Sequence, residues 1–247
     1  MRRLLSLLFA LCGALSAAPA AAKDLSVALS QTVVAITTQF TGAELLLYGA
    51  KEGPGDIVVV VRGPLRDQVV RRKDKIAGIW INRAEVAFDR IPAFYAVASN
   101  RPIEEFLGPK VRATHQIGVE YLDLAPKAAS APADELSAFR AALIRNMRRD
   151  RLYGATAGNV NFLTRQLFNT RIHFPANVSV GQFGVDVHLA RNGEIALTET
   201  RLINVRKLGI EASIYDFAHR HALAHGILAV LLAVAAGWLA NAAFRKK

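Results

Sequence analysis

Residues 222–244 read ALAHGILAVLLAVAAGWLANAAF, an apolar stretch with no aspartate, glutamate, lysine or arginine. As a helix rising about 1.5 Å per residue it is roughly 34 Å long, which exceeds the hydrocarbon core of a bilayer at about 30 Å. Arg245, Lys246 and Lys247 follow it. We therefore predict a single transmembrane helix over 222–244 and a cytoplasmic basic tail over 245–247, because basic residues favour the cytoplasmic side.

The amino terminus has the layout of a secretory signal peptide over residues 1–22. Arg2 and Arg3 precede the apolar run 4–15, and small alanine-rich sequence follows up to Ala22. This apolar run is too short to cross a bilayer comfortably, so cleavage after Ala22 is favoured over an uncleaved anchor. The only cysteine, Cys12, lies inside this segment, so the mature chain is expected to contain no disulfide.

The region between the two ends is predicted to be mainly β. We divide it into an N-terminal β-rich region (23–125), a linker with an amphipathic helix (126–154) and a C-terminal β-rich region (155–221). Short apolar segments separated by turn residues are typical of a β-sandwich. We expect an immunoglobulin-like sandwich, built from one or two β-halves, with one inserted helix.

Particular segments support this assignment. Five consecutive β-branched residues, 57–61, indicate a strand buried on both faces. Segments 69–72 and 76–81 suggest a further strand or a hairpin, and Ile117, Val119 and Tyr121 alternate as in a strand. Asn192-Gly193 favours a tight hairpin turn.

Several short sequence segments, or phrases, resemble those of a family of alphaproteobacterial transmembrane proteins that have no assigned chemistry. The phrases are DIVVVVRGP (56–64), RRK (71–73), AGIWIN (77–82), IPAFYAV (91–97), KLGIE (207–211), YDFAH (215–219) and AGW (236–238). The resemblance implies one exported domain with a C-terminal membrane span, and a genomic setting near sulfite-exporter-type permeases. It supplies no catalytic residue.

Within the predicted span, small or polar residues recur every four positions, as is common where two membrane helices pack closely. These helix-packing candidates are His225, Ala229, Ala233, Gly237 and Asn241. Alanine is also simply common in membrane spans. We expect the span to pack against its own copy or against another membrane protein.

The predicted helix 133–153 places Leu136, Phe139, Leu143 and Met147 on one face. Its other face and its C-terminal end are candidates for contact with anions or lipid headgroups, unless they are simply solvated. The residues concerned are Arg140, Arg145, Arg148, Arg149 and Arg151.

Motifs for enzymes and metal centres are sparse. Asp186 and His188 share a strand face, but no nucleophile elbow accompanies them. His221 and His225 lie one helical turn apart with no third ligand nearby, and His115 and His173 have no ligand-spaced neighbours. We therefore expect no enzyme activity, no metal and no cofactor.

The function favoured by these observations is that of a membrane-anchored periplasmic accessory or scaffold protein, assisting an inner-membrane transporter or envelope complex. The alternative is an anchored solute- or anion-binding module, because the net charge is +11. A hydrolase is the least favoured reading. An exported domain rarely meets nucleic acid, so no nucleic-acid partner is expected.

Overall fold

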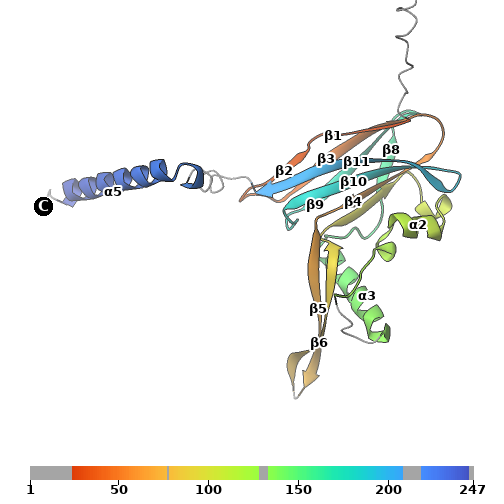
Figure 1. Cartoon of the computed structure of the whole chain (residues 1–247), viewed down its shortest axis with the longest axis horizontal. Coiled ribbons are helices and arrows are strands. Elements are labelled where there is room, and N and C mark those ends of the chain that lie inside the picture. The colour runs from red at the N-terminus through yellow and green to blue at the C-terminus, as the bar shows by residue number, and fades with distance from the viewer. Residues whose placement is uncertain (1–23, 77, 128–132, 208–217, 245–247) are drawn as a thin grey trace, which may run out of the picture.

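Figure 1 shows the computed structural model, which describes residues 24–76, 78–127, 133–207 and 218–244. The expected signal peptide (1–22), most of the linker (128–132) and the basic tail (245–247) lie outside these residues. The strands are β1 (Leu25–Leu29), β2 (Val33–Ile36), β3 (Gly42–Lys51), β4 (Asp56–Arg62), β5 (Leu65–Ile76), β6 (Ile79–Pro92), β7 (Tyr95–Ser99), β8 (Gly158–Phe162), β9 (Leu167–Pro175), β10 (Gly181–Arg191) and β11 (Glu194–Lys207). The helices are α2 (Pro109–His115), α3 (Ala133–Arg149) and α5 (Ala222–Phe244), with short 3₁₀ turns η1 (Ile103–Glu105) and η2 (Val119–Tyr121).

Nine strands form one curled sheet in the order β1-β3-β9-β8-β7-β4-β10-β11-β2. Neighbours are antiparallel except for β7–β8 and β11–β2, which are parallel. The β7–β8 joint is short, with only two residue pairs. Curling brings the sheet's two ends together, because the Arg201 guanidinium on β11 donates to the Val27 carbonyl on β1 (2.9 Å). This sheet and the elements packed on it make up the β domain (residues 24–207).

Strand β4 separates two hydrophobic cores, which confirms the prediction of a strand buried on both faces. Ile57, Val59 and Val61 face the inside of the curled sheet, whereas Val58 and Val60 face the helices. All five side chains are buried. Successive strand residues point to opposite faces, so this sequence suits a strand that lies between two layers.

The inner core lies within the curl of the sheet. Phe94, Phe174 and Phe183 meet there, with ring centroids 5.3 to 5.8 Å apart. Strands from early and late in the chain alternate around this core, because β9 pairs with β3 and β10 pairs with β4.

The outer core lies between the sheet, the β5–β6 hairpin and the helices (Figure 1). The predicted amphipathic helix is α3, whose Phe139, Leu143 and Met147 are buried in this layer. The alternating segment 117–121 also packs here, but it forms the 3₁₀ turn η2 and not the expected strand. Gly118 explains the difference, because its φ of 110° bends the chain away from a strand.

The structure therefore confirms a mainly β fold with a C-terminal apolar helix, but it does not confirm the immunoglobulin-like sandwich. Strands β1, β3, β9 and β8 form a curled half-barrel that is continuous with the other five strands. In a sandwich, no hydrogen bonds would join the strands of one sheet to those of the facing sheet. Here the pairing of β7 with β8 connects the two groups of strands into one continuous sheet.

Helix α5 spans 222–244, the bounds expected from the sequence. Among the described residues, it is the one helix that is long and apolar enough to cross a membrane, over Ala222–Asn241. None of this segment is buried against the rest of the described chain. Its apolar side chains therefore have no place in either core of the β domain.

Candidate functional site

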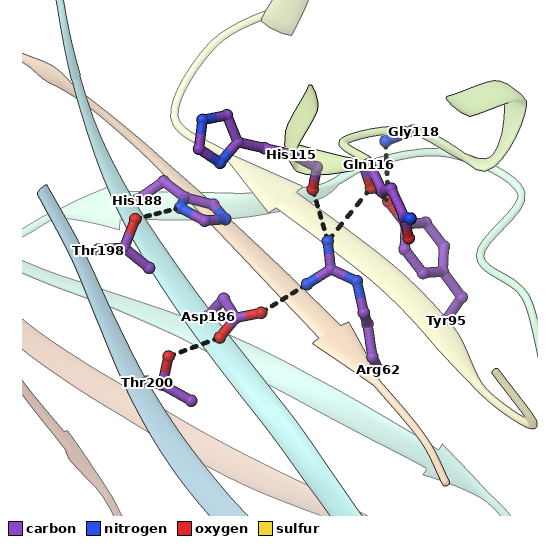
Figure 2. Close-up of polar contacts among 9 residues, drawn as sticks. All are labelled: Arg62, Tyr95, His115, Gln116, Gly118, Asp186, His188, Thr198 and Thr200. Atoms are coloured by element: carbon purple, nitrogen blue, oxygen red, sulfur yellow. Dashed lines mark hydrogen bonds and ion pairs between the residues drawn. The ribbon is translucent and has the colours of Figure 1, made fainter. Parts of the chain in front are cut away.

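A cluster of polar side chains occupies the face of the sheet that carries the outer core (Figure 2). On β4 this face presents Val58, Val60 and then Arg62, and β10 pairs alongside. Asp186 lies opposite Val60, and His188 lies opposite Val58. The register therefore confirms that Asp186 and His188 share a face. We call the nine residues drawn in Figure 2 the polar junction.

Arg62 connects the sheet to the end of α2. Its Nη1 donates to a carboxylate oxygen of Asp186 (2.5 Å), and its Nη2 donates to the backbone carbonyls of His115 (2.6 Å) and Gln116 (3.4 Å). Carbonyls in the last turn of a helix lack partners within the helix, so a guanidinium is well placed to satisfy them. Gln116 is left-handed, with φ 50°, which turns the chain out of α2.

Tyr95 holds the same turn from β7. Its hydroxyl donates to the Gln116 carbonyl (2.7 Å) and accepts from the Gly118 amide (2.8 Å). Burial raises the pKa of Tyr95 to about 12, so the hydroxyl keeps its proton at neutral pH. The arrangement fixes the chain between α2 and η2.

Two threonines of β11 complete the polar junction. Thr200 donates to Asp186 (2.7 Å), and the Thr198 hydroxyl lies 2.8 Å from Nδ1 of His188. His188 is 4% exposed, and its Nε2 is buried with no hydrogen-bond partner in the part of the chain that the structure describes. Burial is the main cause that lowers the pKa of His188 to about 4, so the imidazole is neutral at pH 7.

The hydrogen bonds of the polar junction differ from those of a nucleophilic triad. In a nucleophilic triad the carboxylate orients the histidine, and the histidine activates the nucleophile. Here the hydrogen bonds drawn from Asp186 go to Arg62 and Thr200, not to His188. Among the described residues, no group of three or more His, Cys, Asp or Glu is placed to hold a metal ion. The polar junction therefore fastens the helical layer to the sheet.

A second feature is a pocket of about 300 Å³ beside the short β7–β8 joint. Ala98 and Gly158, which pair across that joint, both line it. Its wall also includes Val59, Phe94 and Ile172, side chains of the inner core. Ligand pockets in proteins begin at about this volume and are mostly apolar.

Basic side chains lie at the rim of this pocket. Arg148 comes from the last turn of α3, and Arg151 lies two residues beyond the end of that helix. Arg171 and His173 come from β9. Both β9 residues pair with Glu44, at 3.4 and 3.2 Å. For Arg148 and Arg151 the structure gives no side-chain partner among the described residues. We call this feature the arginine pocket.

A family model described as "Putative transmembrane protein (Alph_Pro_TM)" matches residues 24–246. The chain belongs to this family. The match confirms the resemblance drawn from the sequence and covers both the β domain and α5. No curated protein and no solved structure matches the chain.

In this Alph_Pro_TM chain the five arginines singled out from the sequence have different surroundings. Arg148 and Arg151 line the arginine pocket. Arg140 donates to the Leu124 carbonyl (3.0 Å), and Arg149 pairs with the neighbouring Asp150 (3.4 Å). Arg145 is exposed and is not part of the pocket. The structure thus brings two of the five to one site.

The helix-packing candidates all lie on α5. Ala229, Ala233, Gly237 and Asn241 are exposed, and a Cβ added at Gly237 would meet nothing within 4 Å. His225 begins the series, and its amide bonds to the His221 carbonyl (2.9 Å) as the helix requires. A stripe of this kind leaves room for a second helix to approach.

Sequence reasoning missed most of the polar junction. The sequence alone does not single out Arg62, Tyr95, Thr198 or Thr200 as site residues. The Asn192-Gly193 turn is only a partial signal for the threonines. It predicts that β10 pairs with β11, but a β-bulge between Leu189 and Ala190 shifts the register by one residue, and this shift places Thr198 and Thr200 opposite His188 and Asp186. No comparable local signal indicates that the end of α2 packs against Arg62.

Proposed function

We propose that this Alph_Pro_TM protein is a non-enzymatic accessory or scaffold protein that α5 anchors in the inner membrane. In this proposal the β domain lies in the periplasm and assists a transporter, such as a sulfite-exporter-type permease, or an envelope complex. The single observation that supports it is α5, an apolar helix that the rest of the described chain leaves uncovered.

The orientation follows from the two ends of the sequence. The signal-like residues 1–22 would direct the β domain across the membrane, and the basic residues 245–247 would stay in the cytoplasm. Cleavage of the signal would leave the β domain attached to the membrane through α5. Protease added to intact spheroplasts should then digest the β domain and spare an epitope placed after Lys247.

Function as an accessory protein requires α5 to meet another membrane helix. We predict that Ala233→Leu/Gly237→Leu abolishes the adducts formed by a photo-crosslinking residue at position 229, because two leucines would fill the groove that a partner helix needs. SDS gels of membranes irradiated in intact cells measure the adduct.

The matched control is Ala224→Leu/Ala235→Leu, which adds similar bulk on the opposite face of α5. Its adduct should persist. An unchanged adduct in the Ala233/Gly237 variant would refute packing through this stripe. The mass of the adduct separates self-association from a partner, and a stoichiometric partner that co-purifies in mild detergent would support the accessory role.

The arginine pocket favours a second candidate, an anchored anion-binding module. Arg151 has φ 58°, a backbone conformation that costs most residues about 1 kcal/mol and that glycine adopts freely. An arginine at this position brings a side chain to the pocket rim. An apolar wall beside two arginines that have no side-chain partner among the described residues suits an anion with a short apolar tail, such as a carboxylate or a phosphate monoester.

For this candidate we predict that hexanoate or hexyl phosphate raises the unfolding temperature of the full chain in nanodiscs. Arg148→Gln/Arg151→Gln should weaken binding about tenfold, since an exposed charge pair contributes up to about 1 kcal/mol. Arg145→Gln/Arg149→Gln, on the same helix and outside the pocket, is the control. Equal binding by hexylamine, or equal loss in both variants, would contradict a specific anion site.

A further inference from the structure

The β5–β6 hairpin extends beyond the body that it packs against. Near the sheet its side chains are buried, among them Val70, Val86 and Phe88. Farther along, the hairpin continues past the helical layer (Figure 1). We call residues 73–76 and 78–82 the hairpin end.

The hairpin end exposes four large apolar side chains close together. Their exposed fractions are 49% for Ile76, 68% for Ile79, 64% for Trp80 and 42% for Ile81. Single exposed apolar residues are normal, but a contiguous group marks a contact surface. Neither hydrophobic core includes any of the four, so the fold of the β domain does not require them.

The apolar side chains emerge on both faces of the hairpin. Ile76 pairs with Ile79, and Trp80 pairs with Lys75. Because successive residues on a strand point to opposite faces, Trp80 lies on one face and its neighbours Ile79 and Ile81 lie on the other. A flat protein surface would cover only one of these faces. A medium that surrounds the hairpin on all sides would cover both.

Basic residues lie within and beside the hairpin end. Between positions 71 and 83 the chain has five lysines and arginines and one acidic residue. Asp74 pairs with Arg83 (3.5 Å), whereas the structure gives no partner for Lys73 or Lys75 among the described residues. A protein surface that combines apolar and aromatic side chains with nearby lysines suits a layer of anionic headgroups. Each lysine near such a layer contributes about 1 kcal/mol to the free energy of membrane binding.

We propose that the hairpin end inserts into the anionic headgroup layer of the bilayer that α5 spans. Trp80 prefers this interface because its ring is apolar and its N–H is polar. The insertion gives the β domain a second membrane contact, which limits the orientations that a single anchor would allow. The proposal needs α5 in a bilayer, but it does not depend on an accessory partner or on the arginine pocket.

Fluorescence of Trp80 tests the proposal in the full chain. The sequence has two tryptophans, so Trp238→Phe leaves Trp80 as the only one. In nanodiscs containing phosphatidylglycerol we expect blue-shifted Trp80 emission and quenching by bromine placed near the headgroup end of the acyl chains. In phosphatidylcholine discs both effects should be much weaker. The anchor keeps the hairpin beside the bilayer, so a weak intrinsic affinity still suffices.

Lys73→Gln/Lys75→Gln in this background should lower the ratio of inserted to free hairpin about thirtyfold in the anionic discs. Lys110→Gln/Arg165→Gln, which removes two exposed charges elsewhere, should leave the ratio unchanged. Ile79→Ser/Ile81→Ser should abolish the quenching while urea unfolding of the β domain stays the same, since these side chains lie outside both cores.

Three results would overturn the proposal. The first is red-shifted, unquenched Trp80 emission in anionic discs. The second is a blue shift that is independent of lipid and rises with the number of chains per disc, which would indicate a second copy covering the hairpin end. The third is a blue shift that appears only when other membrane proteins are present, which would indicate a protein partner.

Discussion

Gly49→Val should lower the free energy of unfolding of the β domain by about 3 kcal/mol. Gly49 on β3 lies directly opposite Phe168 on β9, and the phenylalanine ring covers the space where a side chain would be. A Cβ at position 49 would lie 2.1 Å from the ring. Phe168 is 1% exposed and belongs to the inner core, so the ring has no free volume into which to move.

Gly184→Val on β10 is the matched control. Gly184 is also a strand glycine, but a Cβ there would meet nothing within 4 Å, so stability should change by at most about 0.5 kcal/mol. Urea-dependent pulse proteolysis of the full chain in nanodiscs measures both variants. The double variant Gly49→Val/Phe168→Ala should lose less stability than the sum of the losses in the two single variants, because the valine occupies space left by the ring. Equal stability of the two glycine variants would contradict this packing.

Lowering the pH from 7 to 5 should destabilise the β domain by about 2 kcal/mol through His188 alone. The pKa of His188 is lowered to about 4 in the folded chain, from an ordinary value of 6.5. Between these two values the unfolded chain binds the proton and the folded chain does not, so acid favours unfolding. The effect is nearly absent above pH 7 and complete below pH 4.

Three neighbours modify this low pKa besides burial. The carboxylate of Asp186 raises the pKa of His188, whereas His115 and Arg62 lower it further. His188→Gln should remove most of the dependence of stability on pH between 7 and 5. His173→Gln, at a histidine that is 71% exposed, should retain it. Urea titrations at both pH values give the slope, and a wild-type slope in the His188 variant would show that another group is responsible.

The parts of the fold that local sequence determines were predictable. Residues 57–61 are β-branched throughout, and only a strand between two apolar layers uses such a run. Asn192 and Gly193 both have positive φ, as a tight hairpin turn requires. The bounds of α5 follow from the polar residues at either end of one apolar run. In each case the deciding information lies within a few neighbouring residues.

The parts that depend on distant pairing were not predictable. The curled sheet requires β9 to pair with β3 and β2 to lie parallel to β11. The alternation of apolar and polar residues along each strand does not specify these partners, because it is equally compatible with a sandwich. The helix α2 was missed because it is short and only Arg112 among its residues is buried. The contact between Arg62 and Asp186 joins residues 124 positions apart, which no local pattern encodes.

The double burial of β4 has a consequence for how the molecule assembles. Strand β4 contributes side chains to both cores. Neither layer can therefore reach its final packing until β4 has paired with β10 and β7. Those neighbours are distant in sequence, which makes such a nucleus slow to form. The newly synthesised polypeptide would therefore expose its valine-rich segment for an extended time, and both layers would be expected to melt together in one cooperative step.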